Sequence, residues 1–204
     1  TIILPKNMSD ERKTLLKSYG ANLVLVDDFL SAFSLCKEYE DKGYFCPHQF
    51  ENESNFICHY QLTAPEIYEK IKHQNVKNFV CGVGTSGTLS GVGKFLKEKG
   101  FSVTALEPFN SRILTNQKPF LKHSLQGLAD EIVPKLYQKI VPDKIVQIKD
   151  EDAIFMAQQL CKKLSLGVGI SSGANFLASV LSEENSVTIF ADDNKKYLST
   201  ALLK

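Results

Sequence analysis

Residues 78–88, Asn-Phe-Val-Cys-Gly-Val-Gly-Thr-Ser-Gly-Thr, decide the fold. The first five predict a short buried strand, and residues 89–99 predict a helix that ends at Gly100. Glycines between them let an anion approach successive backbone N–H groups, hydroxyls add donors, and the helix N-terminus adds partial positive charge. The turn therefore predicts a phosphate site, here named the phosphate cup (residues 84–88), although a plain tight connection would need similar glycines.

Short apolar runs and helical stretches alternate on both sides of this turn. Predicted strands are residues 1–4, 23–26, 44–46, 78–82, 102–107 and 186–190, and predicted helices are residues 10–17, 29–41, 63–72, 89–99, 150–164 and 171–181. The alternation predicts an α/β protein with mostly parallel sheets flanked by helices. A polar, irregular stretch over 47–55 predicts two domains, 1–56 and 57–204, the second carrying the cup.

Two helix starts carry capping signals. Ser9 and Asp10 are predicted to cap the first helix, and Gly20 to stop it. Thr63 and Glu66 have the spacing of a capping box, with Pro65 tolerated in the first turn.

Composition excludes several classes of function. In 204 residues, 24 basic and 23 acidic side chains nearly cancel, so no strong field predicts a nucleic-acid or membrane partner. No apolar run approaches the roughly 18 residues of a membrane-spanning helix, and no signal-peptide pattern opens the chain, so a cytoplasmic protein is predicted. The five cysteines are scattered along the chain, which predicts reduced thiols. Cys46 with His48 and Cys58 with His59 do not have the ligand spacing of a zinc site, so no metal is predicted.

The glycine-rich turn fits two known nucleotide-binding motifs to different degrees. A P-loop needs lysine before its last hydroxyl residue, but Gly87 precedes Thr88. A dinucleotide-binding turn fits better, because Gly82, Gly84 and Gly87 have the G-x-G-x-x-G spacing and Glu107 follows twenty residues after Gly87. A nucleotide-binding Rossmann domain therefore stays open as an alternative.

A second small-residue motif opens the helix predicted at 171–181. It runs Gly-Ile-Ser-Ser-Gly-Ala over residues 169–174. The hydroxyl of Ser171 could meet a heterocyclic nitrogen, or Ser171 and Ser172 could simply form the helix N-cap.

In this order and at this separation, the two motifs resemble the cysteine synthase family of pyridoxal-phosphate enzymes, which includes cystathionine β-synthase. The likeness spans nearly the whole chain. Further matching stretches are residues 1–5 with the M-S-x-E-R run at 8–12, Gly20-Ala21, Gln49-Phe50-x-Asn52, His59, Pro65-Glu66-Ile67, Glu107-Pro108 with Ser111, His123 with Gln126-Gly127, and residues 197–200. The resemblance implies the two-domain fold of fold-type-II, tryptophan synthase β-like enzymes.

It also implies roles for single residues. The cofactor phosphate would bind Gly84, Thr85, Ser86, Gly87 and Thr88. Ser171 would bond the pyridine nitrogen, Gln49 would help hold the substrate carboxylate, and Gly127 would line the substrate side. The implied cofactor is pyridoxal 5'-phosphate, and the implied assembly is a homodimer. The implied reaction is β-elimination or β-replacement on a small amino acid: O-acetylserine plus sulfide to cysteine, or cysteine to hydrogen sulfide plus serine.

Three departures from the family pattern carry their own predictions. Ser86 replaces a usual glycine and is expected to add a donor to the cup. Asp130, in an acidic stretch after Gly127, is a candidate general base. The family's S-x-K-D-R-like stretch, whose lysine attaches the cofactor, does not occur, and Lys6, Lys13 and Lys17 fall in a predicted turn and helix.

This missing stretch leads to two expectations. We expect the chain to be the remainder of a longer enzyme that is cut at its N-terminus, and we expect these residues alone not to turn over. The alternative is a catalytically inactive homologue that serves as a binding or regulatory subunit.

Overall fold

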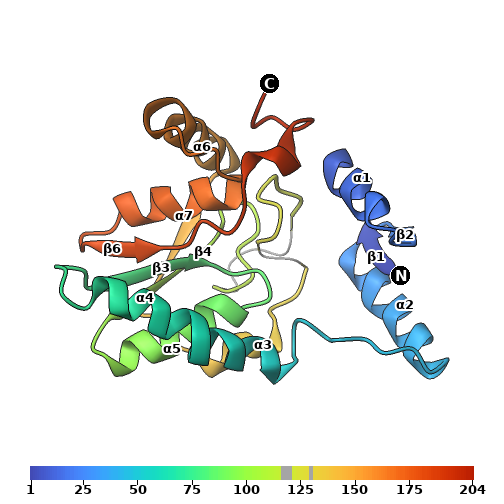
Figure 1. Cartoon of the computed structure of the whole chain (residues 1–204), viewed down its shortest axis with the longest axis horizontal. Helices are drawn as coiled ribbons and strands as arrows, with labels where there is room; N and C mark the ends of the chain where they lie inside the picture. The colour runs from blue at the N-terminus through green and yellow to red at the C-terminus, as the bar shows by residue number, and fades with distance from the viewer. Residues whose placement is uncertain (116–120, 129–130) are drawn as a thin grey trace.

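The computed structural model describes residues 1–115, 121–128 and 131–204, and it contains two parallel sheets (Figure 1). The strands are β1 (Ile2–Pro5), β2 (Leu23–Val26), β3 (Asn78–Gly82), β4 (Ser102–Pro108), β5 (Lys144–Ile148) and β6 (Ser186–Thr188). The α-helices are α1 (Asp10–Ser18), α2 (Phe29–Asp41), α3 (Glu53–Cys58), α4 (Ala64–Ile71), α5 (Gly87–Glu98), α6 (Asp150–Leu164) and α7 (Ile170–Val180). Three short helices complete the set: the π-helix η1 (His59–Thr63) and the 3₁₀-helices η2 (Lys135–Lys139) and η3 (Asn194–Tyr197).

The smaller sheet pairs β1 with β2, in parallel and with Ile2 opposite Leu23. Helix α1 connects the two strands, and Gly20 ends it with a φ of +79°, a conformation that glycine adopts without steric cost. Leu25 keeps 43% of its surface exposed, so this sheet is only partly covered by its own helices.

The larger sheet has the strand order β5-β4-β3-β6, and all of its pairs are parallel. Strand β3 is buried on both faces because successive side chains alternate. Phe79 and Cys81 join the core cluster that includes residues of α4 and α5, whereas Val80 joins the cluster that includes residues of α6 and α7. Figure 1 shows these two helix pairs on opposite faces of the sheet. The predicted fold class, α/β with parallel sheets flanked by helices, is confirmed.

Most predicted elements are present with bounds within two residues, and the strand predicted at 44–46 is wrong. Those residues have no regular structure. Gly43 has a φ of +89°, and the backbone N–H of Tyr44 donates to the carbonyl of Tyr39 at 3.1 Å. The chain therefore turns back along α2 at this point and pairs with no strand.

Ser9 is the N-cap residue of α1 as predicted, but its side chain makes no capping bond, and the capping box predicted at Thr63 and Glu66 is wrong. The hydroxyl of Ser9 donates to the carbonyl of Lys196 at 2.7 Å and makes no capping bond. Thr63 is already helical, because α3 and η1 precede α4 without a break, and its hydroxyl bonds His59 Nδ1 at 3.0 Å. A cap needs extended backbone at the N-cap residue, which Thr63 lacks.

Three further elements differ from the prediction: β5 and α3 were missed, and β6 was predicted too long. β5 follows a proline-rich stretch that obscured its apolar pattern, and β6 ends at Thr188, two residues short of the predicted strand end. Helix α3 begins within the stretch that was predicted to be irregular.

The predicted division into 1–56 and 57–204 stays a prediction. Position 56 falls inside α3, which packs with η1 against α5 of the larger unit. Among the described residues, no helix is long and apolar enough to cross a membrane.

Candidate functional site

The phosphate cup lies between the carboxyl end of β3 and the N-terminus of α5. Ser86 precedes the helix with a φ of +69°, and among the described residues no carbonyl accepts a hydrogen bond from the backbone N–H of Thr85 or Ser86. The first N–H groups of a helix have no acceptor within it, and they carry part of its positive end charge. The cup thus presents uncommitted donors in an electropositive position, which suits an anion.

The hydroxyl of Ser86 does not contribute to this donor set. It lies 2.8 Å from the hydroxyl of Ser90, which itself donates to the carbonyl of Leu136 at 2.8 Å. Because Ser90 has one hydrogen and gives it to Leu136, Ser86 must give its own hydrogen to Ser90. The donor expected from this serine is therefore used inside the protein, and Ser86 can serve an anion only through its backbone N–H.

Thr85 keeps its hydroxyl hydrogen. Its Oγ1 accepts from Asn55 Nδ2 at 3.0 Å and from the backbone N–H of Gly87 at 3.4 Å, which occupies both lone pairs. The remaining hydrogen can donate to an anion in the cup. Asn55 Nδ2 also donates to the carbonyl of Gln49 at 2.8 Å, so one side chain joins the predicted substrate residue to the cup.

The hydroxyl of Thr88 lies 3.2 Å from Nε2 of His59. Burial lowers the pKa of His59 below its ordinary value, so the ring is neutral at neutral pH and one nitrogen accepts while the other donates. Where Nε2 carries the hydrogen, Thr88 keeps its own hydrogen for an anion.

Gly127 lies against the cup from the other side. A Cβ added to Gly84 would come within 2.4 Å of the carbonyl oxygen of Gly127, and one added to Gly82 would meet Leu128 at 2.6 Å. Gly127 itself has a φ of +88°. The glycines at 82 and 84 therefore permit close contact with the loop that carries Gly127. Asp130, the candidate general base, lies outside the described residues.

Ser171 stands in the first turn of α7, and α7 begins at the same edge of the sheet as α5. Asn175, one turn further on, joins the two: its Oδ1 accepts from the N–H of Gly82 at 2.8 Å, and its Nδ2 donates to the carbonyl of Ile189 at 2.8 Å. Among the described residues, the Ser171 hydroxyl has no hydrogen-bond partner, although the residue is only 8% exposed. An uncommitted hydroxyl in such a position favours a ligand atom as its partner.

Glu107 does not act as the acid of a dinucleotide site. It is fully buried, and its carboxylate accepts hydrogen bonds from the N–H and hydroxyl of Thr115, the N–H of Leu114 and the amide of Gln147. These bonds leave it no exposed oxygen for a ribose hydroxyl. The Rossmann alternative loses the residue that supported it.

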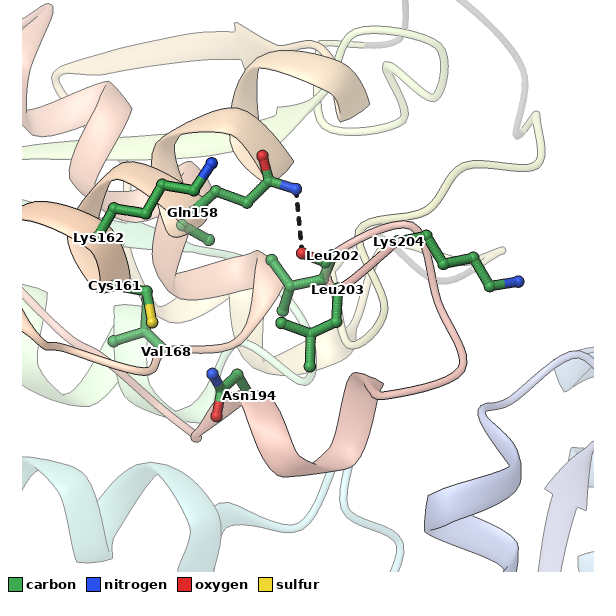
Figure 2. Close-up of a pocket in the computed structure, with 9 residues that line it drawn as sticks. Gln158, Cys161, Lys162, Val168, Asn194, Leu202, Leu203 and Lys204 are labelled. Carbon is green, nitrogen blue, oxygen red and sulfur yellow. Dashed lines mark hydrogen bonds between the residues drawn. The ribbon is translucent and has the colours of Figure 1, made fainter.

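Two hollows of the surface lie away from this site. One of about 280 Å³ lies between α6 and the C-terminal segment, where the amide of Gln158 donates to the carbonyl of Leu202 at 3.0 Å (Figure 2). Another, of about 510 Å³, lies between α1 and η3. Neither hollow is lined by the cup, Ser171, Gln49 or Gly127. The candidate site is therefore assigned from its hydrogen-bond donors and close contacts, and not from a cavity.

Known proteins resemble this chain in sequence and fold. Cysteine synthase of Staphylococcus aureus strain N315 is 36% identical over 98% of this chain and 68% of its own length. A hydrogen sulfide-producing enzyme from Fusobacterium nucleatum is 41% identical, with a TM-score of 0.92 over 100% of this chain and 65% of that one. The family model described as pyridoxal-phosphate dependent enzyme matches residues 1–192. The chain belongs to the pyridoxal-phosphate-dependent enzyme family.

Within this family the chain lies in the cysteine synthase and cystathionine β-synthase group, as its resemblance implied. An O-acetylserine dependent cystathionine β-synthase from Helicobacter pylori is 31% identical, with a TM-score of 0.90 over 99% of this chain and 69% of that one. The chain spans about two thirds of the length of these relatives. The fold-type-II class is confirmed, and the cofactor of the family is pyridoxal phosphate.

The residues present fit that cofactor. The donors of the cup suit its phosphate, and the Ser171 hydroxyl, also beyond the carboxyl edge of the sheet, suits a ring nitrogen. Lys6 and Lys13 instead pair with Asp27 at 2.7 Å and Asp10 at 3.0 Å, on the exposed side of the smaller unit.

Two residues of the site escaped sequence reasoning. Asn55 and Asn175 hold the cup to the Gln49 segment and to α7, yet each is a lone amide in its stretch. No local sequence signal marks Asn55; its role is visible only in the structure, where a Cβ at Gly87 would lie 1.9 Å from Asn55 Oδ1.

Proposed function

We propose that this chain forms the cofactor-binding part of an enzyme that carries out β-replacement or β-elimination on a small β-substituted amino acid. The candidate reactions are O-acetylserine plus sulfide to cysteine, and cysteine to hydrogen sulfide plus serine. The observation that carries the proposal is the pairing of uncommitted donors at the cup with the uncommitted Ser171 hydroxyl at the same sheet edge. Relatives whose names state these activities support it.

Each residue has a proposed part. The backbone N–H groups of residues 84–88 and the Thr85 hydroxyl bind the phosphate, and Ser171 bonds the ring nitrogen. When bound, pyridoxal phosphate withdraws electrons from the α-carbon of the substrate and so makes the β-substituent a leaving group.

A neutral hydroxyl at the ring nitrogen does not force that nitrogen to stay protonated, as a carboxylate would. Ser171 thereby limits how strongly the ring withdraws electrons, which suits loss of a β-substituent. In this proposal Gln49, whose carbonyl accepts from Asn55, would orient the substrate carboxylate, and Gly127 would line the substrate side.

Binding of pyridoxal phosphate tests the core of the proposal. Dissociation constants come from equilibrium dialysis, and ³¹P NMR follows whether the bound phosphate still titrates near pH 6, as a free phosphate monoester does. Thr85→Val removes one charge-assisted hydrogen bond of about 1.5–3 kcal/mol, so we expect about 10- to 150-fold weaker binding. Thr14→Val, at an exposed threonine of α1, is the matched control and should leave binding unchanged.

Two results would contradict the proposal. One is binding of a nicotinamide dinucleotide with no affinity for pyridoxal phosphate. The other is equal loss of binding in the Thr85 and Thr14 variants. The reaction is tested on protein purified from its natural source, by measuring cysteine formed from O-acetylserine and sulfide, and sulfide released from cysteine.

The assembly and location remain further proposals. We propose a cytoplasmic homodimer; the exposed aromatic side chains of Tyr44 and Phe45, 60% and 89% exposed, offer apolar surface for a second copy. Light scattering coupled to size-exclusion chromatography distinguishes the monomer from the dimer.

A further inference from the structure

Arg12 on α1 contacts Gln126 and Tyr197, which lie in two segments next to the candidate cofactor site, although α1 belongs to the smaller sheet's unit (Figure 1). We infer that Arg12 is a positioning residue that couples the seating of α1 to cofactor binding. The inference rests on the proposed function, because it concerns the same site. Its support comes from two chains of contacts that start at the two terminal nitrogens, Nη1 and Nη2, of one guanidinium.

The first chain leads to the cup. Arg12 Nη1 donates to Gln126 Oε1 at 2.6 Å, and Gln126 precedes Gly127. The carbonyl of Gly127 lies so close to Gly84 that a Cβ there would approach within 2.4 Å. A shift of Gln126 therefore moves the loop that packs directly on the phosphate cup.

The second chain leads to the start of α7. Arg12 Nη2 contacts the hydroxyl of Tyr197 at 3.3 Å, and its guanidinium lies 5.5 Å from the centre of that ring. The hydroxyl of Tyr197 donates to Asp192 Oδ2 at 2.8 Å. The carbonyl of Asp192 accepts from the N–H of Gly169, the N-cap residue of α7, at 3.0 Å. Ser171 lies two residues further on.

The charge and burial around Arg12 mean that another side chain, such as lysine, would not make the same contacts. The side chains of Arg12 and Asp192 are only 23% and 11% exposed, with Nη2 and Oδ2 3.9 Å apart. Asp192 Oδ1 is buried and has no hydrogen-bond partner among the described residues. Burial raises the pKa of Tyr197 to about 12, so its hydroxyl stays a neutral donor between the two charges. The planar guanidinium serves Gln126 and Tyr197 at once, which a lysine ammonium at the end of a flexible chain does not.

Other bonds hold α1 in place independently of Arg12. Ser9 donates to the carbonyl of Lys196 at 2.7 Å, and Ser199 donates to Glu11 Oε2 at 2.9 Å. An Arg12→Lys variant should therefore fold with α1 still docked. Ser199→Ala is the matched control, because it weakens the docking of α1 without touching either chain of contacts.

The experiment measures pyridoxal phosphate affinity by dialysis and amide hydrogen exchange in residues 10–18, with and without the cofactor. We expect Arg12→Lys to raise the dissociation constant about tenfold and Ser199→Ala to change it less than twofold. Coupling is reciprocal, so cofactor should slow exchange in α1 of the wild type and not of Arg12→Lys.

If Arg12 had only a structural role, Arg12→Lys would lower the free energy of unfolding. The cofactor would still slow amide exchange in α1 of that variant. Wild-type affinity in Arg12→Lys, or no cofactor-dependent protection of α1 in the wild type, overturns the inference. Failure of the wild type to bind the cofactor at all instead refutes the proposed function. If Arg12→Lys does not fold, Gln126→Leu serves in its place, because it removes only the hydrogen bond between Arg12 and Gln126. It should weaken pyridoxal phosphate binding by a similar factor, and unchanged affinity in this variant overturns the inference as well.

Discussion

The contact between Gly87 and Asn55 gives the sharpest prediction. A methyl group on residue 87 would stand 1.9 Å from Asn55 Oδ1, whereas ordinary contacts begin at 3.4 Å. Gly87→Ala must therefore push the Asn55 side chain away. That movement breaks its hydrogen bonds to Gln49 at 2.8 Å and to Thr85 at 3.0 Å.

The magnitude follows from those two bonds. At about 0.5–1.5 kcal/mol each, Gly87→Ala should cost about 1–3 kcal/mol of unfolding free energy. Asn55→Ala should cost a similar amount, because it removes the same bonds. In the Asn55→Ala background, the methyl at 87 loses the clash with Asn55 Oδ1 and gains up to about 1 kcal/mol of helix propensity.

The double variant should thus be no less stable than Asn55→Ala alone. Urea unfolding of the wild type, both single variants and the double variant measures this coupling. Gly93→Ala, elsewhere on α5, is the control: its methyl would meet Ile140 Cδ1 at 2.5 Å, so its cost should add to that of Asn55→Ala. Additive losses for Gly87 and Asn55, within about 0.5 kcal/mol, would refute the reasoning.

Two further predictions concern single buried groups. Glu107→Gln places an amide donor against the donors of Leu114 and Thr115 and should cost about 1–3 kcal/mol in urea unfolding at pH 7; wild-type stability would contradict the assigned bonds. Because burial lowers the pKa of His59 in the folded state from 6.5, the unfolded chain binds more protons below that pH. The contribution of His59 is therefore complete above about pH 6.5 and is lost as the pH falls through the interval below it. His59→Gln, which can still bond Thr88, should show a smaller loss of stability between pH 7.5 and 5.5, and an equal loss would count against the assignment.

Much of the fold could be predicted because its signals are local. Strand β3 is an apolar run, and the glycine-rich turn after it has a composition that few other structures need. The capping bond predicted for the Ser9 side chain failed for the opposite reason. Whether Ser9 caps α1 depends on whether another acceptor is nearer, and that acceptor is the carbonyl of Lys196, far away in the sequence.

In the candidate site, too, local motifs were predictable and contacts between remote residues were not. The cup and Ser171 carried recognisable motifs, but the loss of the Ser86 donor to Ser90 depends on Leu136 in a remote loop. Glu107 has the spacing of a ribose-binding acid, and only its burial against Thr115 and Gln147 removes that role.

The sequence by itself determined the alternating parallel architecture and the position of the cup, because apolar periodicity and glycine placement act over a few neighbouring residues. The family followed from the resemblance that its motifs carry in their order along the chain. Tertiary structure alone decided which side chains share the site: Asn55 meets Thr85, and Arg12 meets Gln126 across 114 positions of sequence. Such pairs form because the sheet brings distant loops to one edge, and hydrogen bonds a few ångströms long depend on that packing and not on the local pattern.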